Sequence, residues 1–286
     1  MIILNADDYA ITEGVSRAIL ELASVRHLSA TSALVTSPHW PDDAPGLVKQ
    51  RGNLAIGLHL NFTLGAPLGP MARIAPDGKF PTLKQLLTHS IARRLDALEI
   101  GAEICRQLDR FERVLGFPPD HIDGHQHIQV LPVIRQALIA ELKCRFPRGG
   151  PLVRDPSDRL EAVIRRNGGR IKAVSVNMLA LGFAKLARMA GFATNDGFSG
   201  FSEFDTARSY AAELSNQMKE IGRCHIIMCH PGYPDAELAE LDPVVARRGQ
   251  ELATLLQASE LAGRIWRPER PNDGPTVDWR LLASPA

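Results

Sequence analysis

The sequence predicts an α/β fold in which a mostly parallel sheet is flanked by helices. Strand-like and helix-like segments alternate along the 286 residues, which is the pattern of consecutive βαβ units. The candidate catalytic side chains all lie at the ends of apolar runs, and parallel α/β folds bind ligands at the carboxyl ends of their strands. One large domain or two small ones would fit this length, and we expect a single domain over 1–286.

The first half of the chain opens with an apolar strand and continues through helix and strand patterns. Thr12 is placed to cap a helix on which Val15, Ile19 and Leu22 share one face. A long amphipathic pattern later ends at Gly116, a residue type common at helix C-termini. The predicted elements are a strand at 1–6, a helix from 12 to about 25, strands at 31–36 and 54–60, and a helix at about 93–115.

A stretch rich in Gly and Pro near 64–85 separates the third predicted strand from the long helix. We expect a long inserted loop there, and loops of that length in compact domains are commonly lids or binding loops. The last dozen residues, which include Trp279, are expected to pack weakly or fray. The remaining predicted elements are strands at 121–128, 152–154, 171–176, 224–229 and 265–267, and helices at 132–142, 177–190 and 206–221.

Composition and charge exclude several classes of protein. The formal net charge of +1 gives no indication of a nucleic-acid or membrane-surface partner. We expect no transmembrane helix, because no apolar run reaches about 18 residues, and no basic, apolar signal segment opens the chain. The four cysteines lack CxxC spacing, so we expect reduced, mostly buried thiols and a cytoplasmic protein. They are Cys105, Cys144, Cys224 and Cys229.

Two adjacent carboxylates, Asp7 and Asp8, follow the first apolar run. Carboxylates repel each other and resist burial, so a pair at the end of a core strand needs a compensating charge or a chemical task. At a strand-to-loop turn both can line one cavity, where one can bind a metal and the other can take a proton from water. The alternative is a helix cap beside a solvated acid.

Histidines mark the ends of three other predicted strands. On a continuous strand His121, Asp123, His125 and His127 would share one face, which favours metal ligation over an apolar core. A polar edge strand is the alternative, and spacing does not say which of these histidines binds metal. His59 closes an apolar strand, where a buried core histidine is the alternative. An imidazole such as His230, at a Pro-Gly turn, suits a general acid, with an ordinary turn residue as the alternative.

One carboxylate and two imidazoles would make a three-ligand metal site that leaves positions open for water and substrate. Such an open site is catalytic rather than structural. Zinc suits the nitrogen ligands, whereas magnesium prefers oxygen but stays open as the native ion. The residues alone therefore predict a mononuclear metal hydrolase.

Four short motifs occur in the order and spacing of a known family. The chain resembles the YdjC-like carbohydrate deacetylases, which include the chitooligosaccharide deacetylase, over nearly its whole length. The resemblance implies a distorted (β/α) barrel of mostly parallel strands, akin to the polysaccharide deacetylases. The motifs are Asn5-Ala6-Asp7-Asp8-Tyr9, Ala55-Ile56-Gly57-Leu58-His59, His121-Ile122-Asp123-Gly124-His125-Gln126-His127 and His230-Pro231-Gly232.

The resemblance also implies a reaction, which is removal of the acetyl group from an N-acetylated amino sugar. It implies one divalent metal ion, Mg²⁺ or Zn²⁺, held by Asp8, His59 and His125. It further implies that Asp7 is the base and that His230 is the acid. The chain has Ala10 and Gln129 where the family usually has Gly and often has His, and neither departure removes a proposed ligand.

Further residues are expected to contact substrate or to support the ligands. Aromatic rings could stack on a sugar, Asp123 could orient a ligating histidine, and Arg154 could tune Asp7, bind substrate or form a surface salt bridge. The stretch 196–201 resembles the hopanoid-biosynthesis-associated branch, which implies a glycolipid substrate met at the inner membrane surface. The expected residues are Tyr9, Asp123, His127, Arg154 and Phe198.

Two other functions remain open at this point. One is a metal-dependent hydrolase of another amide or ester on the same scaffold. The other is a carbohydrate-binding protein without catalysis, although binding alone would need neither Asp7 nor His230. The sequence is compatible with a homodimer but does not define the oligomeric state.

Overall fold

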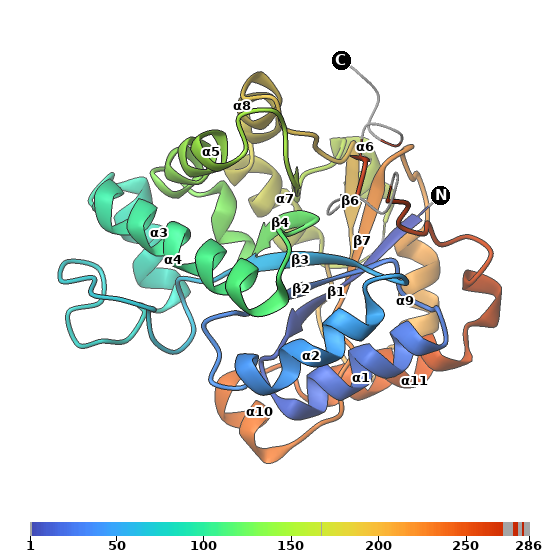
Figure 1. Ribbon diagram of the computed structural model, residues 1–286. Helices are drawn as coiled ribbons and strands as arrows, with labels where there is room; N and C mark the ends of the chain where they lie inside the picture. The colour runs from blue at the N-terminus through green and yellow to red at the C-terminus, as the bar shows by residue number, and fades with distance from the viewer. Residues whose placement is uncertain (1, 167, 271–276, 280–281, 283–286) are drawn as a thin grey trace.

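The computed structural model describes residues 2–166, 168–270, 277–279 and 282. Seven strands form one sheet in the order β5-β4-β3-β2-β1-β7-β6, and every neighbouring pair is parallel (Figure 1). This confirms the predicted fold class. The strands are β1 Ile2–Tyr9, β2 Ala30–Ala33, β3 Ala55–Leu60, β4 His121–Gly124, β5 Leu152–Val153, β6 Gly197–Ser199 and β7 His225–Cys229.

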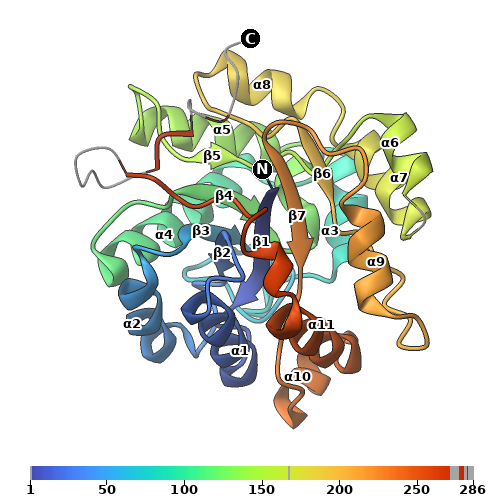
Figure 2. The ribbon, with the colours of Figure 1, turned by 90° about the vertical axis from the view of Figure 1, so that its right-hand side faces the viewer.

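The sheet curls into a distorted, open barrel with helices around its outside (Figure 2). Its two hydrogen-bonding edges are the short strands β5 and β6. The helices are α1 Glu13–Ser24, α2 Trp40–Gln50, α3 Leu83–Ile91, α4 Ala97–Leu115, α5 Ile134–Arg145, α6 Leu160–Arg165, α7 Arg170–Leu179, α8 Phe183–Met189, α9 Tyr210–Gln217, α10 Ala236–Leu241 and α11 Ala246–Gln257, with 3₁₀ turns η1 His125–Val130 and η2 Ser259–Leu261.

Alternation along β1 separates two apolar clusters. Ile2 and Leu4 belong to the large cluster that contains the buried face of α1, whereas Ile3 packs with residues of the other strands and with Trp266 and Trp279. Because alternate residues of a strand point to opposite faces, Ile3 marks the face of β1 that lines the inside of the curled sheet. The site described below lies on this inner side, at the carboxyl ends of the strands.

Local signals set the ends of the best-predicted helices. The Thr12 side chain accepts a hydrogen bond from the Val15 backbone N–H at the start of α1. Asp96 caps α4 in the same way, and Gly116 ends it in the left-handed conformation with φ 78°. Both helices were expected, although α4 begins a few residues later than predicted.

Several predicted elements are wrong in type or length. Residues 171–176 were expected to be a strand but lie in helix α7, and 265–267 contribute only an isolated bridge between Ile2 and Ile265. The strand predicted at 121–128 ends at Gly124, where η1 begins. The sequence patterns also missed α2, α3, α6, α10, α11 and β6.

The expected long loop lies between β3 and α3, and residues 61–82 contain neither helix nor strand. Its amino end is held by Asn61, whose Oδ1 accepts hydrogen bonds from the backbone N–H groups of Thr63 and Leu64. Further along, the buried carboxylate of Glu103 on α4 accepts a hydrogen bond from the Leu68 N–H at 3.0 Å. The loop is therefore fastened to the body of the protein at both of these points.

The described part of the C-terminal segment is packed rather than frayed. Trp279 is buried, its indole N–H donates to the Asp120 carbonyl, and its ring centroid lies 4.9 Å from that of Trp266. This contradicts the expectation of weak packing for Trp279, while 275–276, 280–281 and 283–286 fall outside the described residues. Burial of two indoles explains the difference, because they cover the apolar residues inside the sheet.

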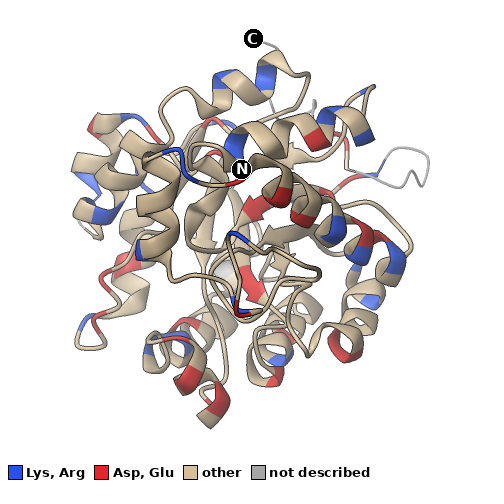
Figure 3. Cartoon of the chain, turned by 90° about the vertical axis from the view of Figure 1, so that its left-hand side faces the viewer, with Lys and Arg blue, Asp and Glu red and all other residues tan. Residues whose placement is uncertain are grey.

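The surface and the cysteines agree in part with expectation. Lys and Arg are interspersed with Asp and Glu over the helices seen in Figure 3. All four cysteines are free thiols, but only Cys224 and Cys229 are buried, and Cys144 is exposed. Among the described residues, no helix combines the length and the apolar character that a bilayer crossing requires.

Candidate active site

An irregularity in β1 places both carboxylates of the Asp7–Asp8 pair in one site. The pairing of β1 with β2 shifts register between Ala6 and Tyr9, and Asp8 has a φ of 68°. Successive residues of a regular strand face opposite sides, but a bulge with a left-handed residue turns the second side chain back. The strand continues to Tyr9, so the pair sits within a distorted strand end rather than in a loop after it.

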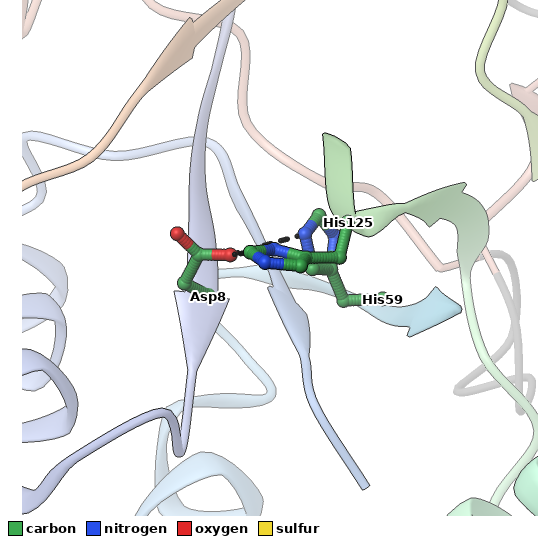
Figure 4. Close-up of side chains that lie close together, drawn as sticks. All are labelled: Asp8, His59 and His125. Atoms are coloured by element: carbon green, nitrogen blue, oxygen red, sulfur yellow. Dashed lines mark hydrogen bonds and ion pairs between the residues drawn. The ribbon is translucent and has the colours of Figure 1, made fainter. Parts of the chain in front are cut away.

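Asp8 on β1, His59 on β3 and His125 at the start of η1, just after β4, converge on one point (Figure 4). Asp8 Oδ1 lies 3.1 Å from His59 Nε2 and 2.9 Å from His125 Nδ1. One ligand atom from each residue lies within 4.8 Å of the other two, and all three residues are buried. This is the trio that the family resemblance implied, and the geometry lets it share one cation.

His59 is oriented by its neighbour across the sheet. His59 on β3 is paired in register with Asp123 on β4, and the Asp123 Oδ1 lies 2.6 Å from His59 Nδ1. A carboxylate behind a ligating imidazole fixes its tautomer and leaves the other nitrogen free for a metal. Although burial opposes the cation, the neighbouring carboxylate of Asp123 raises the pKa of His59 to about 10. Without a metal, this imidazole therefore carries a proton between two carboxylates.

The histidine-rich segment does not form one continuous strand face. After Gly124 the chain enters η1, in which Gln126 and His127 adopt left-handed backbone angles. This turn swings His125 toward Asp8, whereas the ring of His121 stays buried in the interior with neither nitrogen hydrogen-bonded among the described residues. The predicted shared face is therefore wrong. β4 is also fully buried, which excludes the polar edge strand.

Asp7 is held by a buried arginine. Arg154, just after β5, donates from Nη1 to Asp7 Oδ1 at 2.7 Å and from Nη2 to Asp7 Oδ2 at 2.8 Å. The same Nη1 lies 2.8 Å from Asp123 Oδ2. Burial alone would raise the pKa of Asp7, but the guanidinium outweighs it and holds that pKa below its usual range. The surface salt bridge considered for Arg154 is excluded, since its side chain is fully buried.

Gln129, a departure from the family pattern, supports this arginine. Its side-chain Nε2 donates a hydrogen bond to the Arg154 backbone carbonyl at 3.2 Å. The amide therefore helps to hold the segment that carries the guanidinium.

His230 follows β7 and lines the same cavity as Asp7, Asp8, His59 and His125. Its backbone N–H donates to the buried carboxylate of Glu251 on α11 at 2.6 Å. Burial lowers the pKa of His230, although Asp8 and Asp7 offset part of that effect. Burial also raises the pKa of Glu251 to about 7. No sequence motif marks Glu251, which lies in the amphipathic helix α11.

The second oxygen of Asp8 is taken by another residue that sequence reasoning missed. Arg248 Nη2 on α11 donates to Asp8 Oδ2 at 2.6 Å and to Asp242 Oδ2 at 2.6 Å. Burial raises the pKa of Asp8, but Arg248 and then His125 outweigh it and hold that pKa well below its usual range. No local motif marks Arg248, because two adjacent arginines in a helix are common on protein surfaces.

These side chains lie at one end of a cavity of about 650 Å³. Polar and charged groups from the strand ends line it, together with apolar side chains from α7, the 201–204 segment and the α10–α11 link. The lining includes Asp7, Asp8, His59, His125, His127, His230 and Arg248 together with Leu83, Ile171, Lys172, Val176, Phe201, Phe204, Met228, Asp242, Pro243 and Val244.

Not every residue expected at the substrate is there. Tyr9 points away, and its buried hydroxyl donates to the Asp43 carbonyl at 2.7 Å. Phe198 is buried behind the pocket, with the Arg154 guanidinium 5.4 Å from its ring centroid. Phe201 and Phe204 line the cavity instead. A stacking contact by Tyr9 or Phe198 would require the ring to leave its buried position.

His127 does reach the pocket wall. Its ring centroid lies 5.3 Å from that of Phe201, and its Nδ1 has no hydrogen-bond partner among the described residues. Burial lowers the pKa of His127 to about 3, so the ring is neutral near pH 7. It can offer a hydrogen bond to a ligand without adding charge.

Charge in this cluster favours a bound cation. Four carboxylates, those of Asp7, Asp8, Asp123 and Asp242, contact only two guanidiniums, those of Arg154 and Arg248. Arg248 takes Oδ2 of Asp8, so that Oδ1 faces the two imidazoles. Asp7, His59 and Asp123 also approach within 4.8 Å, but there the Arg154 guanidinium already binds an oxygen of each acid. The donor set of Asp8, His59 and His125 therefore fits a divalent metal better.

Comparison with known proteins agrees with this architecture. The chitooligosaccharide deacetylase of Proteus mirabilis (strain HI4320) is 32% identical over 140 residues, which cover 48% of this chain and 54% of that protein. The chain thus spans about half the length of that relative. The chitooligosaccharide deacetylase of Serratia marcescens is 28% identical over 241 residues, or 84% of this chain and 85% of that protein.

A solved structure shows the same fold over the full length. A protein of Enterococcus faecalis V583, provisionally named for cellobiose-phosphate cleavage, has a TM-score of 0.70 and 22% identity, covering 99% of this chain and 98% of that one. At that identity the likeness concerns the fold alone. Residues 1–262 match the family model described as YdjC-like protein. The chain therefore belongs to the YdjC-like protein family.

Proposed function

We propose that this protein hydrolyses the N-acetyl group of an N-acetylated amino sugar, with one divalent metal ion at the site. The observation that carries the proposal is the convergence of Asp8, His59 and His125 beside the arginine-bound Asp7, in the lining of a cavity of about 650 Å³. The names of the Proteus mirabilis and Serratia marcescens relatives support a carbohydrate deacetylase.

The metal would be held by Asp8 Oδ1, His59 Nε2 and His125 Nδ1. When bound, it supplies Lewis-acid polarisation for the acetyl carbonyl and the attacking water. Two imidazole nitrogens and one carboxylate favour a borderline ion such as Zn²⁺, and Mg²⁺ is the second candidate. His59 must release its proton to bind the ion, because its Nε2 is needed as a ligand.

Asp7 is the proposed general base. Arg154 fixes its plane, and the lowered pKa keeps the carboxylate ionised at neutral pH. Asn5 and Arg154 both donate to Oδ1, whereas Oδ2 accepts from Arg154 alone among the described groups. Oδ2 is therefore the oxygen with capacity left to take a proton from the water.

His230 is the proposed general acid. Hydrolysis of an amide requires a proton on the leaving nitrogen, because an amine anion is a poor leaving group. The lowered pKa makes protonated His230 a ready donor, and the protonated fraction decreases as the pH rises. Asp7 gains one proton and His230 loses one, so the products are the free amino sugar and acetic acid, which releases its own proton to solvent and leaves as acetate.

The proposed substrate class is an N-acetylglucosaminyl compound, either an oligosaccharide or a glycolipid. Apolar side chains such as Val176, Phe201 and Val244 line the wall, and Ile171 at the pocket is 82% exposed. This apolar wall supports a substrate with an apolar face beside its sugar. A hopanoid-linked sugar, as the resemblance implies, is the glycolipid form of this proposal.

The test is release of acetate by the purified chain after metal removal and reloading with Zn²⁺, Mg²⁺ or Co²⁺. N-acetylated chitooligosaccharides and N-acetylglucosaminyl glycolipids are offered in parallel, with O-acetylated sugars as the ester control. We expect equimolar acetate and free amine from an N-acetyl substrate, and loss of both after chelation. Acetate from the ester alone, or none from any sugar by a metal-loaded protein, would overturn the proposal.

A further inference from the structure

Arg248 joins two residues that line the cavity, Asp8 and Asp242. Its Nη2 donates to Asp8 Oδ2 and to Asp242 Oδ2, each at 2.6 Å, and its side chain is only 1% exposed. Its Nε also donates to the Val244 carbonyl at 3.0 Å. One buried guanidinium thus connects the end of β1 with the link between α10 and α11.

This contact restricts how Asp8 can bind a cation. An aspartate can ligate through one oxygen or through both. Here Oδ2 is occupied by Arg248, so that Oδ1 alone faces His59 and His125. Single-oxygen ligation keeps one more coordination position open for water or substrate.

The other end of the connection also lines the cavity. Asp242, Pro243 and Val244 line the cavity, and Asp242 Oδ1 accepts a hydrogen bond from the Val244 N–H at 2.7 Å. The orientation of Asp8 therefore depends on a segment that also forms the pocket wall.

We propose that Arg248 is a positioning residue for the metal ligand Asp8, and that Asp242 holds Arg248 in that role. The inference rests on the proposed metal site but concerns residues outside the trio. It predicts that losing the guanidinium weakens metal binding even in a protein that remains folded. A purely structural Arg248 would instead affect stability alone.

The preceding residue supplies a matched control. Arg247 on α11 is equally buried, forms an ion pair with Glu213 and donates to the carbonyls of Asp205 and Arg208. None of these contacts involves Asp8. Replacing Arg247 removes a buried guanidinium from the same helix and leaves the contact to Asp8 in place.

The experiment uses the full chain, stripped of metal by a chelator, as wild type and as R248Q, R248K, D242N and R247Q. Zinc affinity is measured by competition with a chromogenic chelator, and the unfolding midpoint of each metal-free protein is recorded. We expect R248Q to bind zinc about 10–100-fold more weakly. R248K should recover part of this loss, D242N should show a smaller loss, and R247Q should lower the midpoint without changing zinc affinity.

The results separate this inference from the function beneath it. If wild type binds zinc and folded R248Q binds it equally well, Arg248 is not a positioning residue. An equal loss in R247Q would also overturn the inference, because it would attribute the effect to packing of α11. If R248Q does not fold, unchanged zinc affinity in D242N overturns it. Failure of wild type itself to bind zinc, cobalt or magnesium would instead refute the proposed metal site.

Discussion

The two carboxylates of the Asp7–Asp8 pair are held by different parts of the molecule. Asp7 accepts hydrogen bonds from Arg154, which also pairs with Asp123. All three residues are buried and lie within or just after strands of the sheet. Asp8 accepts a hydrogen bond from Arg248, which also donates to Asp242 in the lining of the cavity. The proposed base is therefore bound by an arginine at the end of a sheet strand, whereas the proposed metal ligand is bound by an arginine of helix α11 whose partner Asp242 lines the cavity.

Two residues that are neighbours in sequence can therefore serve separate tasks when their binding partners differ. Arg154 binds both oxygens of Asp7 and so fixes the plane of that carboxylate. Arg248 binds one oxygen of Asp8 and leaves the other for the imidazoles. Substitutions that affect one carboxylate and spare the other test whether the two roles are separate.

The largest effect is expected from substitutions in the ligand trio. D8A and H125A should lose bound metal, and acetate release should fall to background, because two remaining ligands do not hold the ion. Metal content per protein chain after dialysis is the measurement, with wild type and D7N treated alongside. Full metal content and activity in D8A would show that the ligand assignment is wrong.

The next effect separates chemistry from metal binding. D7N and H230Q should keep their metal while kcat falls about 10²–10⁴-fold, which is the usual contribution of a general base or acid. In H230Q the decline of the rate toward alkaline pH should also disappear, since the titrating acid is gone. Rates are measured across pH at saturating substrate. An unchanged pH–rate profile in H230Q would refute the acid role.

The smallest effect concerns stability and pH at Glu251. Burial raises its pKa from 4.5 to about 7, so the folded state binds a proton more tightly than the unfolded state. Its contribution to stability is therefore present below about pH 4.5 and is lost as the pH rises through about 7, by at most about 3 kcal/mol.

E251Q tests this contribution, because the amide can still accept the hydrogen bond from the His230 N–H. The free energy of unfolding is measured from pH 4.5 to 8 for wild type and E251Q. The advantage of wild type over E251Q should shrink across that range. A constant difference between the two proteins would contradict the raised pKa.

The elements that could be predicted are those whose type and ends are set by residues within the element itself. The apolar runs of β1, β3 and β7 read as buried strands, and the caps of α1 and α4 are local. Residues 171–176 misled the pattern because the β-branched residues Ile171, Val174 and Val176 lie within six positions. In the structure this is helix α7, and Ile171 is 82% exposed. Contacts distant in sequence, not local preference, decide such a segment.

The residues of the candidate site also fall into those that the sequence predicts and those that it does not. Asp7, Asp8, His59, His125 and His230 stand at strand ends, where parallel sheets gather ligands, so their convergence could be anticipated. Arg248 and Glu251 could not, because they belong to a helix whose face toward the sheet is set only when the chain closes. Tyr9 was misplaced because the bulge before it alters which side of β1 each residue faces.

The bulge in β1 also has a consequence for protein engineering. Copying the two aspartates onto a regular strand of another barrel would not reproduce the pair, because one carboxylate would face the outer helices and meet apolar side chains. The unit that must be transplanted is the backbone irregularity, with its left-handed residue and one arginine on each flank. A designer should therefore reproduce the backbone conformation of the Asp-Asp dipeptide as well as its two residues.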